Sequence, residues 1–184
     1  QKKLSKNSKC ITIGPIMYYL QSFEKKIILK GKIKILVFDV EPISNTINDE
    51  FYTLQNCKKY IEDIIFVSQK YFKNGLVIYI KRKIRSKIAK DRLDRNYQEF
   101  ITYQKYKFKE NFIELPRNTN IFDALEQVDL SISIPYTSPA YIAQFINKES
   151  FYYDPSGLQK NSFISLPLIN NKNLLDRKIK KLIS

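Results

Sequence analysis

The chain has 184 residues, 43% of them hydrophobic, which is enough for one domain with its own core. Its net charge of +14 favours anionic partners, but only six of the 32 basic residues are arginine. Lysine lacks the forked donors that read bases, so we expect no specific nucleic-acid partner. The absence of histidine excludes Ser–His and Cys–His catalysis within the chain, and with only two cysteines we expect no metal site.

The distribution of apolar and charged residues along the chain predicts two regions. Residues 1–31 are expected to be a lead-in or crossover segment, with a short strand at Cys10–Met17 and a helical turn at Tyr18–Phe23. Residues 32–184 are expected to form a single domain. Its first element, Lys32–Val40, alternates and then becomes continuously apolar, as a buried parallel strand does.

An amphipathic helix is predicted at Asp49–Phe72, because apolar side chains recur there on one face. Either Asn48 or Asp49 is expected to cap its start, since both side chains accept hydrogen bonds from free backbone N–H groups. The dipeptide Asn74-Gly75 is expected to end it, because glycine readily adopts the left-handed conformation found after helices.

A second strand, Leu76–Ile80, runs directly into the basic segment Lys81–Arg85. The elements that follow are a helix at Asp91–Lys105, a strand at Phe112–Pro116, a helix at Ile121–Gln127 capped by Asn120, a strand at Leu130–Ile134, a helix capped by Thr137 or Ser138 with Pro139 in its first turn, and a strand at Phe151–Tyr153. After Gly157 we expect irregular chain until a basic amphipathic helix begins at Asn173.

The regular alternation of strands and helices is typical of α/β proteins with a parallel sheet. We therefore expect a Rossmann-like sheet of about five to six strands with helices on both faces. Ligands of such sheets bind outside the carboxyl ends of the strands. Neither GxGxxG nor GxxxxGK[ST] occurs, so the sequence carries no dinucleotide fingerprint and no P-loop.

Two groups of residues follow strand ends and are predicted to bind an anionic ligand. Lys81 and Arg82 would clamp a phosphate, and the alternative for them is a solvated basic surface. Pro135, Thr137 and Ser138 would present hydroxyl and N–H groups at a helix start, where capping without a ligand is the alternative.

Two carboxylates complete the candidate site. Glu41 follows the first strand and could hydrogen-bond a ribose or act as a base. Asp154 lies in an Asp-Pro-Ser-Gly segment, where it could do the same or could simply form a turn. The sequence does not identify a catalytic residue.

The basic C-terminal helix has an apolar side made by Leu174, Leu175, Ile179, Leu182 and Ile183. It either lies on an anionic membrane surface or packs against the domain. No apolar run approaches the ~20 residues that cross a bilayer. We therefore expect a cytoplasmic protein and leave peripheral contact with the inner face of the cell membrane open.

Four segments together resemble a known family: Ile35–Pro42, Ile80–Arg82, Val128–Ala140 and Phe151–Gly157. Over about Gly14–Gly157, the chain is similar to the C-terminal half of bacterial surface-polysaccharide biosynthesis proteins of the GT-B glycosyltransferase type. The most specific parts are the Ser-x-Pro-x-Thr-Ser-Pro segment that begins at Ser133 and the Tyr-Tyr-Asp-Pro segment that begins at Tyr152.

The resemblance implies a donor-binding domain of a glycosyltransferase that makes capsule or lipopolysaccharide. The donor is a nucleotide sugar, and no further cofactor is expected. A looser similarity to transferases that use cytidine-monophosphate-activated acidic sugars leaves both CMP and UDP open as carriers. An N-terminal acceptor-binding domain would be the partner and would supply the chemistry, so the isolated chain is expected to be inactive.

The donor-binding residues expected on this basis are Glu41, Lys81, Arg82, Pro135, Thr137, Ser138 and Asp154. Two alternative functions remain open at this point. One is a non-catalytic nucleotide- or RNA-binding α/β module, and the other is a GT-B-like epimerase that acts on a UDP-sugar.

Overall fold

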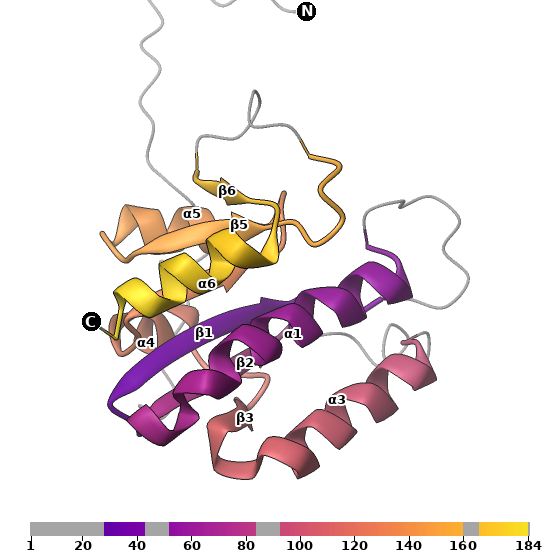
Figure 1. Cartoon of the computed structure of the whole chain (residues 1–184), viewed down its shortest axis with the longest axis horizontal. Coiled ribbons are helices and arrows are strands. Elements are labelled where there is room, and N and C mark those ends of the chain that lie inside the picture. The colour runs from indigo at the N-terminus through magenta and orange to yellow at the C-terminus, as the bar shows by residue number, and fades with distance from the viewer. Residues whose placement is uncertain (1–27, 43–51, 84–92, 160–165, 184) are drawn as a thin grey trace, which may run out of the picture.

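The computed structural model describes residues 28–42, 52–83, 93–159 and 166–183, and its described part folds as an α/β sheet structure (Figure 1). The strands are β1 (Ile33–Asp39), β2 (Leu76–Arg82), β3 (Phe112–Glu114), β4 (Leu130–Ser133), β5 (Ser150–Tyr153) and β6 (Leu168–Ile169). The helices are α1 (Leu54–Ser68), η2 (Gln69–Asn74), α3 (Arg95–Phe108), η3 (Lys109–Asn111), α4 (Ile121–Glu126), α5 (Ser138–Phe145) and α6 (Lys172–Lys181).

The six strands form one sheet in the order β3-β2-β1-β4-β5-β6, and every neighbouring pair is parallel. This is the strand order of the doubly wound Rossmann fold, in which the direction of winding reverses between the first and fourth strands. In the register of β1 with β4, Ile35 pairs with Leu130 and Phe38 pairs with Ser133. The predicted Rossmann-like parallel sheet is thereby confirmed.

Different helices cover the two faces of the sheet (Figure 1). Along β1, Ile33, Ile35 and Val37 belong to the core beneath α1, α3 and α6. The alternate residues Leu36 and Phe38 pack with α4 and α5 on the other face. Because both faces are buried, β1 needs apolar side chains at successive positions, which explains its continuous run. Helices on both faces were predicted and are confirmed.

The first long helix begins later than the sequence indicated. Helix α1 starts at Leu54, and its cap is Thr53, whose hydroxyl accepts a hydrogen bond from the Asn56 N–H at 3.2 Å. The prediction of a start at Asp49 is therefore wrong, because a second good capping residue lies closer to the packed part of the helix. The end was predicted correctly, since Gly75 follows η2 in the left-handed region at φ 86°.

Several other helix and strand boundaries were also predicted, and not all of them agree with the structure. Asp94 caps α3, so this helix starts at Arg95 and not at Asp91. Asn120 caps α4 as predicted, and its side chain accepts from the Phe122 N–H at 2.8 Å. The segment expected to be irregular contains β6, which pairs with the edge of β5. The helical turn and strand predicted within 10–23 lie outside the described residues, so the division at residue 31 stays a prediction.

Candidate functional site

The winding of the sheet reverses between β1 and β4, and in open α/β sheets the crevice at that point, beyond the carboxyl ends, is where ligands bind. The segment Pro135–Ser138 leaves β4 at this place. Its start is anchored to the chain that follows β1, because the Tyr52 hydroxyl donates to the Pro135 carbonyl at 2.8 Å. The structure thus places the predicted Pro135, Thr137 and Ser138 together at the switch point.

The turn that these residues form has an unusual backbone. Tyr136 adopts a left-handed conformation, with φ 64°, although its side chain is bulky. Such a conformation costs about 1–3 kcal/mol and persists only where the surroundings enforce it. The Tyr136 hydroxyl donates to the side-chain oxygen of Gln159, and the Thr137 hydroxyl donates to the Ile134 carbonyl at 2.7 Å. These bonds hold the turn in shape.

The start of α5 is left without a side-chain cap. Thr137 occupies the capping position, as predicted, but its side chain makes no capping hydrogen bond to the first turn. The Thr137 hydroxyl bonds backwards instead, and its carbonyl accepts from the Tyr152 hydroxyl at 2.8 Å. Pro139 lies in the first turn, as predicted. Uncapped N–H groups at a helix start attract anions.

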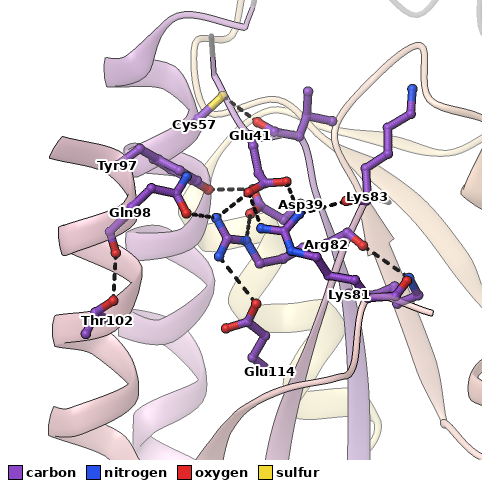
Figure 2. Close-up of polar contacts among 12 residues, drawn as sticks. Asp39, Glu41, Cys57, Lys81, Arg82, Lys83, Tyr97, Gln98, Thr102 and Glu114 are labelled. Carbon is purple, nitrogen blue, oxygen red and sulfur yellow. Dashed lines mark hydrogen bonds and ion pairs between the residues drawn. The ribbon is translucent and has the colours of Figure 1, made fainter. Parts of the chain in front are cut away.

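A buried polar cluster lies beside the switch point, at the carboxyl ends of β1, β2 and β3 (Figure 2). Its centre is Arg82, which ends β2 and is 6% exposed. The guanidinium contacts Glu41 and lies 3.3 Å from both Asp39 and Glu114. It also donates to Gln98 of α3. The alternative of a solvated surface is therefore wrong for Arg82.

The other charged residues near Arg82 differ in their burial and in their partners. Lys81 is also buried, at 9% exposure, and its ammonium donates to the carbonyls of Arg82 at 3.1 Å and Arg117 at 2.7 Å. Lys83 is exposed. Glu41 has a fully buried side chain whose two oxygens accept from Arg82 and Arg117. Contact between a ligand and Arg82 or Glu41 would require these partners to be exchanged.

The sequence prediction missed Arg117, which follows β3. Its guanidinium forks around the Glu41 carboxylate, with Nη1 donating to Oε2 and Nη2 donating to Oε1, both at 2.7 Å. A signal was present in the composition, because arginines are rare in this lysine-rich chain and are selected where two parallel hydrogen bonds are needed.

Burial changes the acid–base properties of the cluster. Burial raises the pKa of Asp39 from 3.8 to about 6, although the hydroxyl of Tyr97, at 2.5 Å, and Arg82 both oppose the rise. Burial lowers the pKa of Lys81 to about 8, and repulsion from Arg117 adds to that effect. The hydrogen bonds with Glu41 raise the pKa of Arg117 further above its ordinary value.

A family model described as "Polysaccharide biosynthesis PFTS motif protein" matches residues 1–176 of this chain. The chain belongs to this family. The four letters in the name of the PFTS motif family differ from Pro135-Tyr136-Thr137-Ser138 at the second position only, where tyrosine replaces phenylalanine. The resemblance to polysaccharide biosynthesis proteins is thus confirmed.

Among solved structures, this PFTS motif chain is similar to one titled "Structure of the Wall Teichoic Acid Polymerase TagF". The two share 13% sequence identity with a TM-score of 0.43, and the match covers 84% of this chain. It covers 38% of the polymerase, so the chain spans well under half of that protein's length. No curated protein matched the sequence.

Asp154 has a structural task in this PFTS motif chain. It is fully buried and accepts hydrogen bonds from the N–H groups of Ser156 and Gln159, each at 2.8 Å, and from the Ser156 hydroxyl at 2.5 Å. This is the pattern of an aspartate that forms a turn, the alternative considered from the sequence. By binding Gln159 at its backbone, Asp154 also positions the residue that holds Tyr136.

A hollow of about 810 Å³ lies elsewhere, along the outer side of α1. Its lining residues are Thr53, Leu54, Gln55, Lys58, Lys59, Glu62, Asp63 and Lys172. None of them comes from the Pro135–Ser138 turn, and the wall carries charges of both signs. We therefore place the candidate site at the strand ends and not in this hollow, because the Pro135–Ser138 turn and the start of α5, which lacks a side-chain cap, lie there.

Across the described ranges, no group of three or more His, Cys, Asp or Glu side chains is arranged to hold a metal ion. Nor is any helix within those ranges long and apolar enough to cross a membrane. The apolar residues Leu175 and Ile179 of α6 are fully buried against the sheet, which confirms packing against the domain for that side.

Proposed function

We propose that this chain is the nucleotide-sugar-binding domain of a GT-B-type glycosyltransferase for surface polysaccharide such as capsule or lipopolysaccharide. The observation that carries the proposal is the position of the Pro135–Ser138 turn at the switch point of a Rossmann-ordered sheet. A ligand crevice is expected there on general grounds. The family description supports a role in polysaccharide biosynthesis, in which sugars are commonly transferred from nucleotide carriers.

In this proposal the donor lies across the carboxyl ends of β4, β1 and β2. The start of α5, with Thr137 and Ser138, receives a phosphate or ribose group, since a helix N-terminus favours negative charge. Strands β4 and β2 flank β1 and are therefore about 10 Å apart, two interstrand spacings. A nucleotide sugar is long enough to reach from the turn to the basic cluster that contains Lys81. Arg82 and Asp154 are buried beneath this surface and hold its residues in place through their hydrogen bonds.

The acceptor and the catalytic residue belong, in the same proposal, to a second domain outside this chain. The domain described here binds the donor and does not transfer the sugar by itself, and it needs no cofactor. We place the enzyme in the cytoplasm, where activated sugars are available. Contact with an anionic membrane would be electrostatic, through exposed basic residues of α6 such as Arg177 and Lys180, because Leu175 and Ile179 on its apolar side are buried.

Thermal unfolding in the presence of UDP, CMP and an RNA oligonucleotide tests the proposal. A ligand at 100 times its Kd stabilises by about 2.7 kcal/mol, which corresponds to about 5–10 °C for a chain of this size. We expect one of the two nucleotides to raise the Tm by this amount and RNA to have no such effect. Absence of any nucleotide effect together with salt-sensitive RNA binding would contradict the proposal and favour the RNA-binding module.

The variant Ser138→Asp tests where the nucleotide binds. Ser138 is exposed and begins α5, so a carboxylate there suits the helix but occupies the position of the ligand anion. We expect the variant to fold and to lose the nucleotide effect. Asn173→Asp is the matched control, because it adds the same charge to the first turn of α6. Equal loss in both variants would show a general charge effect, and no loss in Ser138→Asp would place the ligand elsewhere.

A further inference from the structure

We infer that Arg117 binds a phosphate group of the donor and that Glu41 is its counter-ion in the ligand-free chain. This inference rests on the proposed function, because it names a residue of the same site. Arg117 follows β3, so its guanidinium reaches the cluster at the carboxyl ends of the strands from the side of β2. Three observations support it: the spare donors of Arg117, the double pairing of Glu41 and the charge of the cluster.

The guanidinium of Arg117 has hydrogen-bonding capacity to spare. It carries five N–H donors. Nη1 uses both of its hydrogens, one on Glu41 at 2.7 Å and one on the Lys83 carbonyl at 2.8 Å, and Nη2 uses one on Glu41 at 2.7 Å. The Nε–H and the second Nη2–H have no acceptor among the residues that the structure describes. The side chain is 27% exposed, so these two donors can receive a ligand.

Two arginines pair with the Glu41 carboxylate, and their side chains differ in accessibility. Arg82 approaches it from within β2 with a side chain that is 7% exposed, whereas Arg117 approaches from a loop and is 27% exposed. If Arg117 turned towards a phosphate, Glu41 would keep Arg82 and would not become an unpaired buried charge. Loss of both arginine partners would leave a buried unpaired carboxylate and destabilise the fold, whereas loss of one leaves Glu41 paired with the other. The geometry makes Arg117 the exchangeable partner.

The charge of the cluster favours an additional anion. Among the residues that the structure describes, its four cations are Arg82, Lys105, Lys81 and Arg117, and its three carboxylates are Asp39, Glu41 and Glu114. The ammonium of Lys81 donates only to two backbone carbonyls, so its third N–H has no acceptor in the described part of the chain. A phosphate near Arg117 would therefore neutralise a charge that no described carboxylate neutralises.

Calorimetric titration of the full chain with pyrophosphate, UDP and CMP tests the inference. Arg117→Lys keeps the charge but removes the fork, so we expect the affinity for the bound phosphate compound to fall about tenfold or more. Glu41→Gln removes the counter-ion, so we expect the affinity to rise severalfold. A merely structural role for the Arg117–Glu41 pair would not produce effects of opposite sign. Arg95→Lys, at an exposed position of α3, is the matched control and should bind like the wild type.

The outcomes separate this inference from the proposed function. If the wild type binds none of the three compounds, the proposed donor site itself fails. If the wild type binds but Arg117→Lys binds equally well, or if Glu41→Gln weakens binding, the assignment of Arg117 is overturned while the donor site stands. Should Glu41→Gln not fold, Arg117→Lys compared with Arg95→Lys decides alone. Preference for UDP and pyrophosphate over CMP would identify a diphosphate carrier.

Discussion

Replacing Arg82 with methionine should lower the free energy of unfolding of this domain more than any other charge-removing substitution in the cluster. Methionine keeps much of the length of the arginine side chain but removes the charge and the donors. Arg82 is 6% exposed and its guanidinium lies between the carboxylates of Asp39, Glu41 and Glu114. In its absence, Glu41 retains Arg117, but Asp39 loses the only cation that the described structure pairs with it.

The size of the effect follows from burial. Removal of one partner of a buried ion pair costs about 3–5 kcal/mol, because the remaining charge is left in a medium that solvates it poorly. For a chain of this length, 1 kcal/mol corresponds to about 2–4 °C, so Arg82→Met should lower the Tm by about 6–20 °C. Neutralising Asp39 should recover part of the loss, and the double variant Arg82→Met with Asp39→Asn is expected to be more stable than Arg82→Met alone.

Urea unfolding followed by circular dichroism measures these differences in the free energy of unfolding. Arg95→Met removes an arginine from the exposed start of α3 and should change that free energy by less than about 0.5 kcal/mol. An Arg82→Met variant within about 1 kcal/mol of the wild type would refute the reasoning, since it would mean that the buried carboxylates do not need this cation.

Two further predictions concern pH and capping. The pKa of Asp39 is raised from 3.8 to about 6, so its contribution to stability is full below pH 4 and is lost as the pH rises through 6. Asp39→Asn should therefore flatten the decline of the unfolding free energy between about pH 4 and 7, a span worth at most about 3 kcal/mol; an unchanged profile would assign the decline to another group. Asn120→Ala should cost about 1 kcal/mol, because its side chain accepts from two N–H groups at the start of α4. Asn120→Asp is its control and should stay near the wild type in the same urea titrations, while an alanine variant of unchanged stability would contradict the capping role.

Local signals in the sequence were sufficient for most elements of the fold. The continuous apolar runs of β1 and β2 and the helical periodicity of α1 predict their type, because each depends on side chains within a few residues of one another. Boundaries were less certain where several residues could do the same task. Thr53 caps α1 although the sequence also offers Asn48 and Asp49, and propensity alone does not choose among them.

The short strand β6 shows another limit of the sequence. It has two residues, too few for an alternating pattern, and it exists because its backbone pairs with β5. Likewise, the Thr137 hydroxyl was free to cap α5 by sequence, but in the structure it donates to the Ile134 carbonyl. Such choices depend on partners that the local sequence does not specify.

By itself, the sequence determined that this is a parallel α/β domain with Pro135–Ser138 at the end of a strand, and the resemblance in that segment indicated the family. The tertiary structure alone decided that β1 lies between β2 and β4, and hence which strand ends meet. This order brings Glu41 to Arg82, 41 residues away, and to Arg117, 76 residues away. Periodicity reports on neighbours along the chain, whereas these contacts arise from the packing of whole strands. For that reason Arg82 was predicted as a ligand clamp and is found as the buried centre of a charge cluster, while Arg117 became visible only in the fold.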